Sequence, residues 1–221
     1  MLRRHDLLRV RPDRWPEMLA ASPGAHALTG EPRRLVAGWA GRGRPVVVRR
    51  RAPDDGEGGI AVGLPLPPSC GKLRVALSLP LGWVAEAVAP VSVSEAIRAA
   101  PAGWQAQLEG AIATGERLAV RPALFGALLW QHLTGLPYLH PGSDIDLIWP
   151  TPPMARLPGL LNDIERLNAA GPARIDGEIT LADGGGVNWR ELHRELRVPG
   201  GAVLVKSMDG ADIRCTHTLF T

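Results

Sequence analysis

Alternation of apolar and polar residues predicts β-strands in the first third of the chain. The segment KLRVALSLP (72–80) places its leucines and Val75 on one face and Lys72, Arg74, Ala76 and Ser78 on the other. PVVVRRRAP (45–53) also predicts a strand, DDGEGG (54–59) a turn, and IAVGLPLPP (60–68) a second short strand that ends in prolines. These segments together indicate a small β-rich unit.

Apolar residues recur at helical spacing from residue 92 onward. SVSEAIRAA (92–100) opens with a capping serine, and WQAQLEGAIATGERL (104–118) continues as a second helix. PALFGALLWQHLTG (122–135) predicts a helix with proline near its start and Gly135 as its stop. PPMARLPGLLNDIERLNAAG (152–171) predicts a helix that is interrupted or started late by Pro158 and closed by Gly171.

The last fifty residues alternate between strand and helix patterns. Ile175 to Leu181 predicts a strand, residues 184–186 a glycine-rich turn, and a helix begins at about Trp189. Residues 202–215 predict a hairpin that turns at Asp209 and Gly210. We therefore expect an α/β (α+β) fold with a β-rich N-terminal domain (1–95) and a mixed-sheet C-terminal domain (96–221), the boundary lying near 90–104.

Composition restricts the class of protein. The chain of 221 residues is 45% hydrophobic and 21% charged, as expected of a globular protein with a sizeable core. No apolar run approaches the roughly 20 residues of a membrane span, and the N-terminal segment lacks an apolar signal-peptide core. We expect a soluble cytoplasmic protein whose two cysteines, Cys70 and Cys215, are reduced.

Basic residues are concentrated near the N-terminus. Residues 1–51 hold 12 of the 25 lysines and arginines against four acids, a balance of +8, while the remaining residues carry 13 basic and 18 acidic side chains, a balance of −5. This excess favours a polyanion such as a nucleotide, a phosphorylated cofactor or an acidic protein, and the plainer interpretation is a compositional bias that spreads arginine over the surface. For an acidic protein, Arg49 and Arg50 are positions at which charge reversal would test binding. No aromatic residues interleave with the arginines and no recognition-helix signature is present, so nucleic-acid binding is not expected.

Two acids stand one residue apart in the apolar segment GSDIDLIWP (142–150). In an extended strand Asp144 and Asp146 project from one face, because successive side chains alternate. Neighbouring carboxylates raise each other's pKa unless solvent or a cation screens them. The sharper interpretation is a divalent metal site; the plainer one is a turn cap and a surface salt bridge.

A second acidic strand supplies further candidate ligands. Asp176 and Glu178 share a face of the strand in RIDGEIT, so two adjacent strands would present three or four carboxylates to one site. Such a set suits Mg²⁺ (or Mn²⁺) with a triphosphate substrate. Asp176 is the preferred third carboxylate and Glu178 the alternative.

GSDIDLIW resembles the acidic strand of the nucleotidyltransferase superfamily, which includes DNA polymerase β. Upstream, Gly126 matches the glycine of that superfamily's Gly-Ser helix, whereas Ala127 departs from its serine. The lost hydroxyl would weaken one triphosphate contact, although backbone N–H groups there could still bind phosphate. Over nearly the full length, segments such as FGALLWQHLTGLPYLHPGSDIDLIW, ARIDGEI, VNWREL and VLVKSMDG resemble the malonate decarboxylase holo-acyl carrier protein synthases, or phosphoribosyl-dephospho-CoA transferases.

This resemblance implies a reaction and residue roles. A serine of the apo acyl carrier subunit of malonate decarboxylase would attack the α-phosphorus of 2′-(5″-triphosphoribosyl)-3′-dephospho-CoA and release diphosphate. Asp144, Asp146 and Asp176 would be catalytic and hold the metal, while Gly126, Ala127 and Ser143 would lie against the phosphates. The basic candidates for binding the polyphosphate are Lys72, Arg74 and Lys206, each of which is equally well interpreted as ordinary surface charge.

Two other functions fit the same pattern. One is a nucleotidyltransferase that acts on a different hydroxyl acceptor, such as a small molecule, an RNA end or another protein. The other is a noncatalytic nucleotide-binding module, for which Ala127 is the hint. Neither nucleic acid nor a membrane is expected as a partner of the predicted enzyme.

Overall fold

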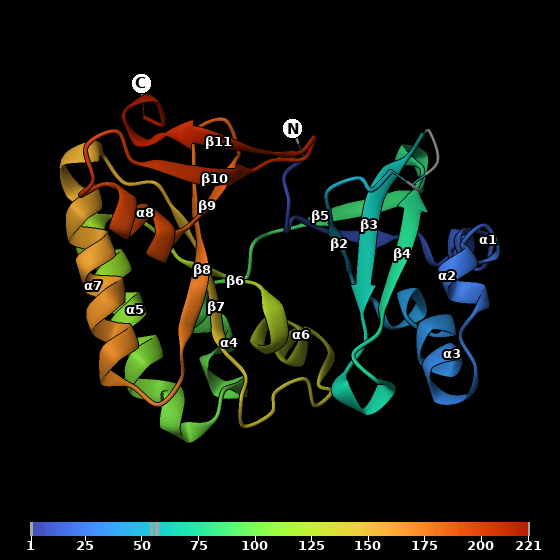
Figure 1. Cartoon of the computed structure of the whole chain (residues 1–221). Helices are drawn as coiled ribbons and strands as arrows, with labels where there is room; N and C mark the ends of the chain where they lie inside the picture. Colours follow the sequence, from blue (N-terminus) through green and yellow to red (C-terminus); the bar gives the residue numbers. More distant parts are fainter. Residues whose placement is uncertain (1, 54, 56–57, 221) are drawn as a thin grey trace. The chain divides into compact units, whose positions relative to one another are not determined.

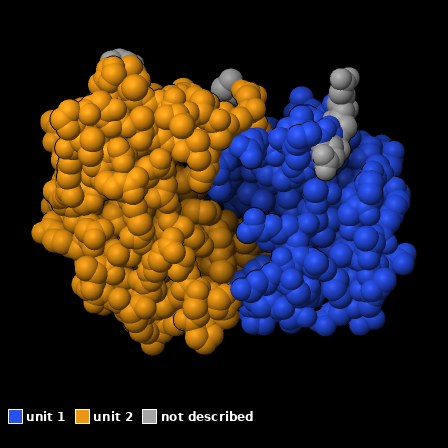
Figure 2. Space-filling model, viewed as in Figure 1, with its two compact units in different colours: residues 1–90, 136–138 blue, residues 91–135, 139–221 orange. Residues whose placement is uncertain are grey.

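The chain folds into two compact units. The computed structural model describes residues 2–53, 55 and 58–220. The N-terminal unit comprises residues 1–90 together with 136–138, and the C-terminal unit comprises 91–135 and 139–221 (Figure 2). Helices accompany a sheet in each unit (Figure 1), which confirms the predicted α/β class.

The N-terminal unit contains a five-stranded antiparallel sheet in the order β4-β3-β2-β1-β5. Its strands are β1 (Leu7–Val10), β2 (Val46–Val48), β3 (Ile60–Pro65), β4 (Arg74–Leu79) and β5 (Val84–Val88). The alternation predicted for residues 72–80 is confirmed in β4, where Val75, Leu77 and Leu79 are buried. Leu73 is the exception, because it precedes the strand and is 44% exposed.

Three short helices of the N-terminal unit were not predicted. They are α1 (Trp15–Ala20), α2 (Pro23–His26) and α3 (Gly30–Ala37). The buried indole of Trp15 donates to Val36 O at 2.8 Å and so joins α1 to α3. Ser22 caps α2 and donates to Ala76 O of β4 at 2.9 Å. These tertiary hydrogen bonds explain why helices of only four to eight residues form, since isolated helices of that length are unstable.

The C-terminal unit contains a six-stranded mixed sheet in the order β11-β10-β9-β8-β7-β6. Its strands are β6 (Ala123–Leu124), β7 (Ile145–Pro150), β8 (Ile175–Thr180), β9 (Gly186–Asn188), β10 (Ala202–Lys206) and β11 (Ala211–Cys215). β7 and β8 pair in parallel and the other neighbours are antiparallel. The predicted hairpin at 202–215 is confirmed by the pairing of Lys206 with Ala211.

Five helices accompany this sheet: α4 (Val93–Ala96), α5 (Gln105–Leu118), α6 (Gly126–Thr134), α7 (Leu157–Ala170) and α8 (Trp189–Glu195). α5, α7 and α8 lie on one side of the sheet (Figure 1). The apolar face of β7 and β8 is fully buried at Ile145, Leu147 and Ile179. The polar residues of the alternating pattern, Asp146 and Asp176 among them, therefore lie on the opposite face of the same two strands.

Short 3₁₀ turns join many of these elements. They are η1 (Pro12–Arg14), η2 (Ala40–Arg42), η3 (Pro68–Cys70), η4 (Leu81–Trp83), η5 (Ile97–Ala99), η6 (Ala102–Trp104), η7 (Met154–Arg156) and η8 (Thr216–Thr218). α7 begins late, with Pro158 in its first turn, as the sequence predicted. Ser92 and Glu95 form the capping box of α4, which confirms the predicted capping serine.

Several element boundaries differ from the prediction. The units separate after Pro90 rather than at 95/96, because Val91 O already accepts from Leu124 N of β6 in the C-terminal unit. The helix predicted for 122–135 starts only at Gly126, since residues 123–124 pair with β7. The glycine-rich turn ends earlier than expected because Gly186 already pairs in β9.

The strand predicted for 45–53 is shorter in the structure. β2 ends at Val48, and the next residue, Arg49, turns its guanidinium to Asp55. The turn predicted for 54–59 falls partly on residues 54, 56 and 57, which lie outside the described residues.

No described helix is long and apolar enough to span a lipid bilayer. Both cysteines are free thiols: Cys70 is buried and Cys215 is exposed.

Gly177 is required by the parallel pairing of β7 with β8. It has a φ of 150°, and a Cβ there would lie 1.9 Å from Leu147 O. We expect Gly177→Ala to lower the free energy of unfolding by about 3 kcal/mol or more. Gly159→Ala is the control, because a Cβ in this helical position has nothing within 4 Å and should stabilise by up to about 1 kcal/mol. Urea unfolding of both variants tests this, and equal stabilities would contradict it.

Candidate active site

The parallel register of β7 and β8 brings the predicted acids together. Asp146 is the direct partner of Asp176 across the strand pair, so both side chains project from the same face. Asp144 lies two residues before Asp146, directly before the first residue of β7. The structure therefore gathers the three preferred carboxylates of the sequence analysis on the polar face of one strand pair.

Arg174 joins two of these carboxylates. Its Nη2 lies 3.3 Å from Asp176 Oδ2 and its Nε lies 3.8 Å from Asp144 Oδ2. The arginine is 58% exposed, so these ion pairs are screened and hold the side chain weakly. Arg174 is thus a displaceable countercharge at the edge of the carboxylate cluster.

Asp146 lies against the N-terminus of α6. The backbone N–H of Ala127 donates to its carboxylate, and Phe125 N donates to Asp146 O at 3.1 Å. Gly126 has a φ of 66°, and a Cβ there would lie 1.8 Å from Asp146 Oδ2. The structure thus gives Gly126 and Ala127 a role different from the predicted phosphate contact: glycine makes room for the carboxylate, and the Ala127 N–H is already engaged by it.

The charge of Asp146 is only partly compensated. Burial raises the pKa of its carboxyl, and the neighbouring Asp176 and Asp144 raise it further, to about 7. The Ala127 N–H and Arg174 lower the pKa, but by less. A carboxylate with such a pKa favours any ligand that brings positive charge to this face.

Asn188 orients Asp176 and was missed by the sequence analysis. Its Nδ2 donates to Asp176 Oδ1 at 3.1 Å, while its Oδ1 accepts from the backbone N–H groups of Arg190 and Glu191 at the start of α8. These bonds define which end of the amide faces the carboxylate. The available signal was an asparagine directly before a helix, which is typical of an N-cap.

Glu178 and Lys206 pair with each other. Lys206 Nζ lies 3.5 Å from Glu178 Oε1, and Glu178 is 7% exposed. This pairing places Lys206 on the polar face of the sheet, beside the alternative third carboxylate. Two residues that the sequence analysis proposed separately, Glu178 as a possible metal ligand and Lys206 as a phosphate contact, therefore form an ion pair.

Among the other predicted phosphate-binding residues, Ser143 lies beside Asp144, whereas Lys72 and Arg74 belong to the other unit. Ser143 Oγ accepts from His140 N at 3.0 Å and so stabilises the turn that leads into β7. Lys72 and Arg74 belong to the N-terminal unit, at the start of β4. Arg49, one of the two arginines assigned to an acidic partner, makes an ion pair with Asp55 and donates to Val62 O, so its side chain has a structural role.

The aspartate cluster has the right chemistry for a hard divalent cation. Three carboxylates on one face supply the oxygen ligands that Mg²⁺ prefers. In the described part of the chain, however, no group of three or more His, Cys, Asp or Glu side chains is arranged to hold a metal as it stands. Ligation would require the carboxylates to turn toward one another and Arg174 to leave Asp144 and Asp176.

Comparison with known families covers nearly the whole chain. Residues 3–90 match the phosphoribosyl-dephospho-CoA transferase MdcG N-terminal domain, and residues 91–217 match the C-terminal domain of the same family. The chain belongs to the phosphoribosyl-dephospho-CoA transferase family. This membership confirms the resemblance found in the sequence and makes the protein a transferase. The junction of the two matches at 90/91 coincides with the division between the structural units.

Curated relatives are also named phosphoribosyl-dephospho-CoA transferase. A phosphoribosyl-dephospho-CoA transferase of Bradyrhizobium diazoefficiens is 38% identical over 208 residues, covering 93% of this chain and 87% of the relative. One of Xanthomonas campestris pv. campestris is 35% identical over 223 aligned positions, covering all of this chain and 97% of the relative. No solved structure gives a significant match.

The raised pKa of Asp146 predicts a pH-dependent stability. Because the folded chain binds this proton more tightly than the unfolded chain, stability is lost as pH rises from about 4 through about 7. Without divalent metal, we expect Asp146→Asn to be more stable than the wild type at about pH 8, on the order of 2 kcal/mol after allowance for partial solvation. The difference should vanish near pH 4. Urea unfolding of both proteins at about pH 8 and about pH 4 measures this difference in the free energy of unfolding. Equal stabilities at about pH 8 would contradict a raised pKa of Asp146.

Proposed function

We propose that this transferase attaches the prosthetic group of malonate decarboxylase. The donor is 2′-(5″-triphosphoribosyl)-3′-dephospho-CoA, and the acceptor is a serine of the apo acyl carrier subunit. The serine oxygen forms a phosphodiester with the α-phosphorus, diphosphate leaves, and the serine proton passes to a base. The observation that carries the proposal is the in-register pair of Asp146 and Asp176 with Asp144 beside it, in a chain of this family.

Asp144, Asp146 and Asp176 are the residues that would hold Mg²⁺ or Mn²⁺. A divalent ion bound there would offset the charge of the triphosphate and polarise the reacting phosphate. Asn188 fixes one oxygen of Asp176, so that the other is turned toward the ligand side of the face. Asp176 is then the residue that accepts the serine proton.

Basic side chains supply the remaining countercharge for the donor. Once it leaves Asp144 and Asp176, Arg174 can donate two parallel hydrogen bonds to phosphate oxygens. Lys206 lies on the same face of the sheet, beside Glu178, and is a further proposed contact of the phosphates. We retain Ser143, which directly precedes Asp144, as a proposed contact of the phosphates, whereas Gly126 and Ala127 act through Asp146.

Intact-mass measurement of the carrier tests the function directly. The purified transferase is incubated with Mg²⁺, the triphosphoribosyl-dephospho-CoA donor and the apo carrier subunit. We expect the carrier to gain the mass of the phosphoribosyl-dephospho-CoA group. The gain should disappear with Asp144→Asn or with EDTA, because both remove the cation from the aspartate cluster.

Glu178→Gln is the matched control, since Glu178 lies on the same face of the sheet but pairs with Lys206. It should retain transfer, whereas Asp176→Asn should abolish it. Folded wild-type protein that leaves the carrier unmodified with competent donor would refute the proposed function. Loss of transfer in Glu178→Gln alone would move the third ligand from Asp176 to Glu178.

Asn188→Ser separates the two tasks of Asn188. Serine remains a good N-cap, so the free energy of unfolding should change by less than about 0.5 kcal/mol. Loss of the amide donor to Asp176 should lower kcat by about 10–100-fold. Chemical unfolding and steady-state kinetics measure the two effects, and unchanged kcat would show that Asp176 needs no such support.

A further inference from the structure

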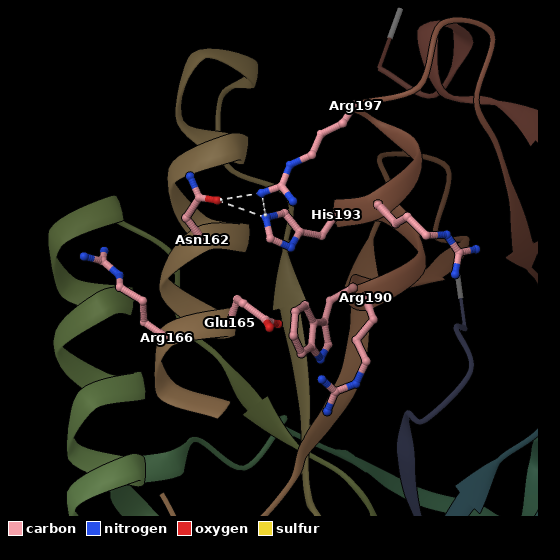
Figure 3. Close-up of a pocket in the computed structure, with 8 residues that line it drawn as sticks. Asn162, Glu165, Arg166, Arg190, His193 and Arg197 are labelled. Carbon is pink, nitrogen blue, oxygen red and sulfur yellow. Dashed lines mark hydrogen bonds between the residues drawn. The ribbon is translucent and has the colours of Figure 1, made fainter. Parts of the chain in front are cut away.

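A hollow of about 910 Å³ lies between α7 and α8 (Figure 3). Helix α7 contributes Asn162, Glu165 and Arg166, and helix α8 contributes Trp189, Arg190, His193 and Arg194, with Arg197 just after it. The function proposed above uses none of these side chains. The hollow belongs entirely to the C-terminal unit.

Positive charge dominates the α8 side of this hollow. Arg190 and Arg194 lie one turn apart on α8, and Arg197 follows just after the helix ends; all three line the hollow, and Arg194 also pairs with Glu195, its Nε lying 2.8 Å from Glu195 Oε1. Burial and the charge of Arg197 lower the pKa of His193, as expected in a positive field. Glu191, the acid beside Arg190, turns away and accepts from Leu204 N at 2.9 Å.

The side chains that line the hollow are partly held in place. Arg197 and His193 both turn toward Asn162 Oδ1 of α7, at 3.2 Å and 2.9 Å (Figure 3). Arg166 points away from α8 and pairs with Asp163. The positive line therefore consists of Arg190, Arg194 and Arg197, and we call it the α8 arginine row.

The arginine row leads to the aspartate cluster. Arg190 stacks at 4.4 Å on the ring of Trp189 and donates to Ile175 O, the carbonyl directly before Asp176. It also lines a second hollow, of about 660 Å³, which includes Arg174. Arg174 in turn contacts Asp144 and Asp176. A continuous basic track thus runs from the α7–α8 hollow to the reacting site.

We propose that the α8 arginine row docks an acidic segment of the acceptor protein; this inference rests on the proposed function. Arginines spaced along a helix match carboxylates spaced along another chain, each by paired hydrogen bonds. The hollow is formed by helices on the apolar side of the sheet, whereas Asp146 and Asp176 project from the other face. A macromolecular acceptor can span from the hollow past the N-terminal end of β8, where Arg174 lies, to the aspartates, which a compact phosphate group cannot.

Charge reversal of the row separates docking from chemistry. In Arg194→Glu/Arg197→Glu, we expect KM for the apo carrier subunit to rise about tenfold or more, with kcat and the KM for the donor unchanged. Added NaCl should raise the wild-type KM for the carrier and affect the double variant less. Arg190 is left intact, because it supports β8 at Ile175 O.

Arg121→Glu/Arg156→Glu is the matched control. It makes the same change in net charge with two exposed arginines of the same unit that do not line the hollow. It should change KM for the carrier less than about twofold. Thermal unfolding of both double variants verifies that each is folded.

Two results would overturn docking at the row. An unchanged KM for the carrier would make the row an ordinary solvated surface, and a raised KM for the donor would make it a phosphate site for the donor instead. Failure of the wild type to modify the carrier would refute the proposed function. Normal wild-type transfer with no effect of reversal would refute the docking surface alone.

Discussion

The pairing of β7 with β8 in parallel is the constraint on which the site depends. Its register places Asp146 directly beside Asp176, and like charges at that separation oppose the pairing. The opposite face of the same strands compensates, because Ile145, Leu147 and Ile179 are completely buried there. The apolar face thus determines the register, and the polar face carries the electrostatic strain that makes a cation favourable.

The Asp146 carboxylate also contacts the backbone at the start of α6. Its carboxylate accepts from the first turn of α6, and the glycine at position 126 exists in a left-handed conformation to admit it. The same carboxylate therefore lies at the N-terminus of α6 and belongs to the aspartate cluster. Ala127, where the superfamily pattern has serine, contacts Asp146 through its backbone N–H, which any residue can supply.

The sequence predicted the elements whose pattern is local and missed those that depend on distant partners. Alternation in β4 and the acidic strand, and the stops at Gly135 and Gly171, follow from steric preferences of a few consecutive residues. β6 and α1 to α3 are too short for periodicity and form through contacts such as the Trp15 indole with Val36 O. Likewise, Asp144, Asp146 and Asp176 were predictable from spacing, but the roles of Arg174 and Asn188 arise from strand register and helix capping.

The division of the chain into units makes one loop depend on residues that are distant in the sequence. The chain leaves the C-terminal unit after Gly135, contributes Leu136–Tyr138 to the N-terminal unit, and then returns. Tyr138 is buried there and donates its hydroxyl proton to Pro65 O at 2.9 Å. The loop between Gly135 and Asp144 is thus held by a hydrogen bond to Pro65, a residue far upstream in the sequence. Without the N-terminal residues the Tyr138 hydroxyl would lose this acceptor, so the segment that leads back to the aspartates depends on a part of the chain more than 70 positions upstream.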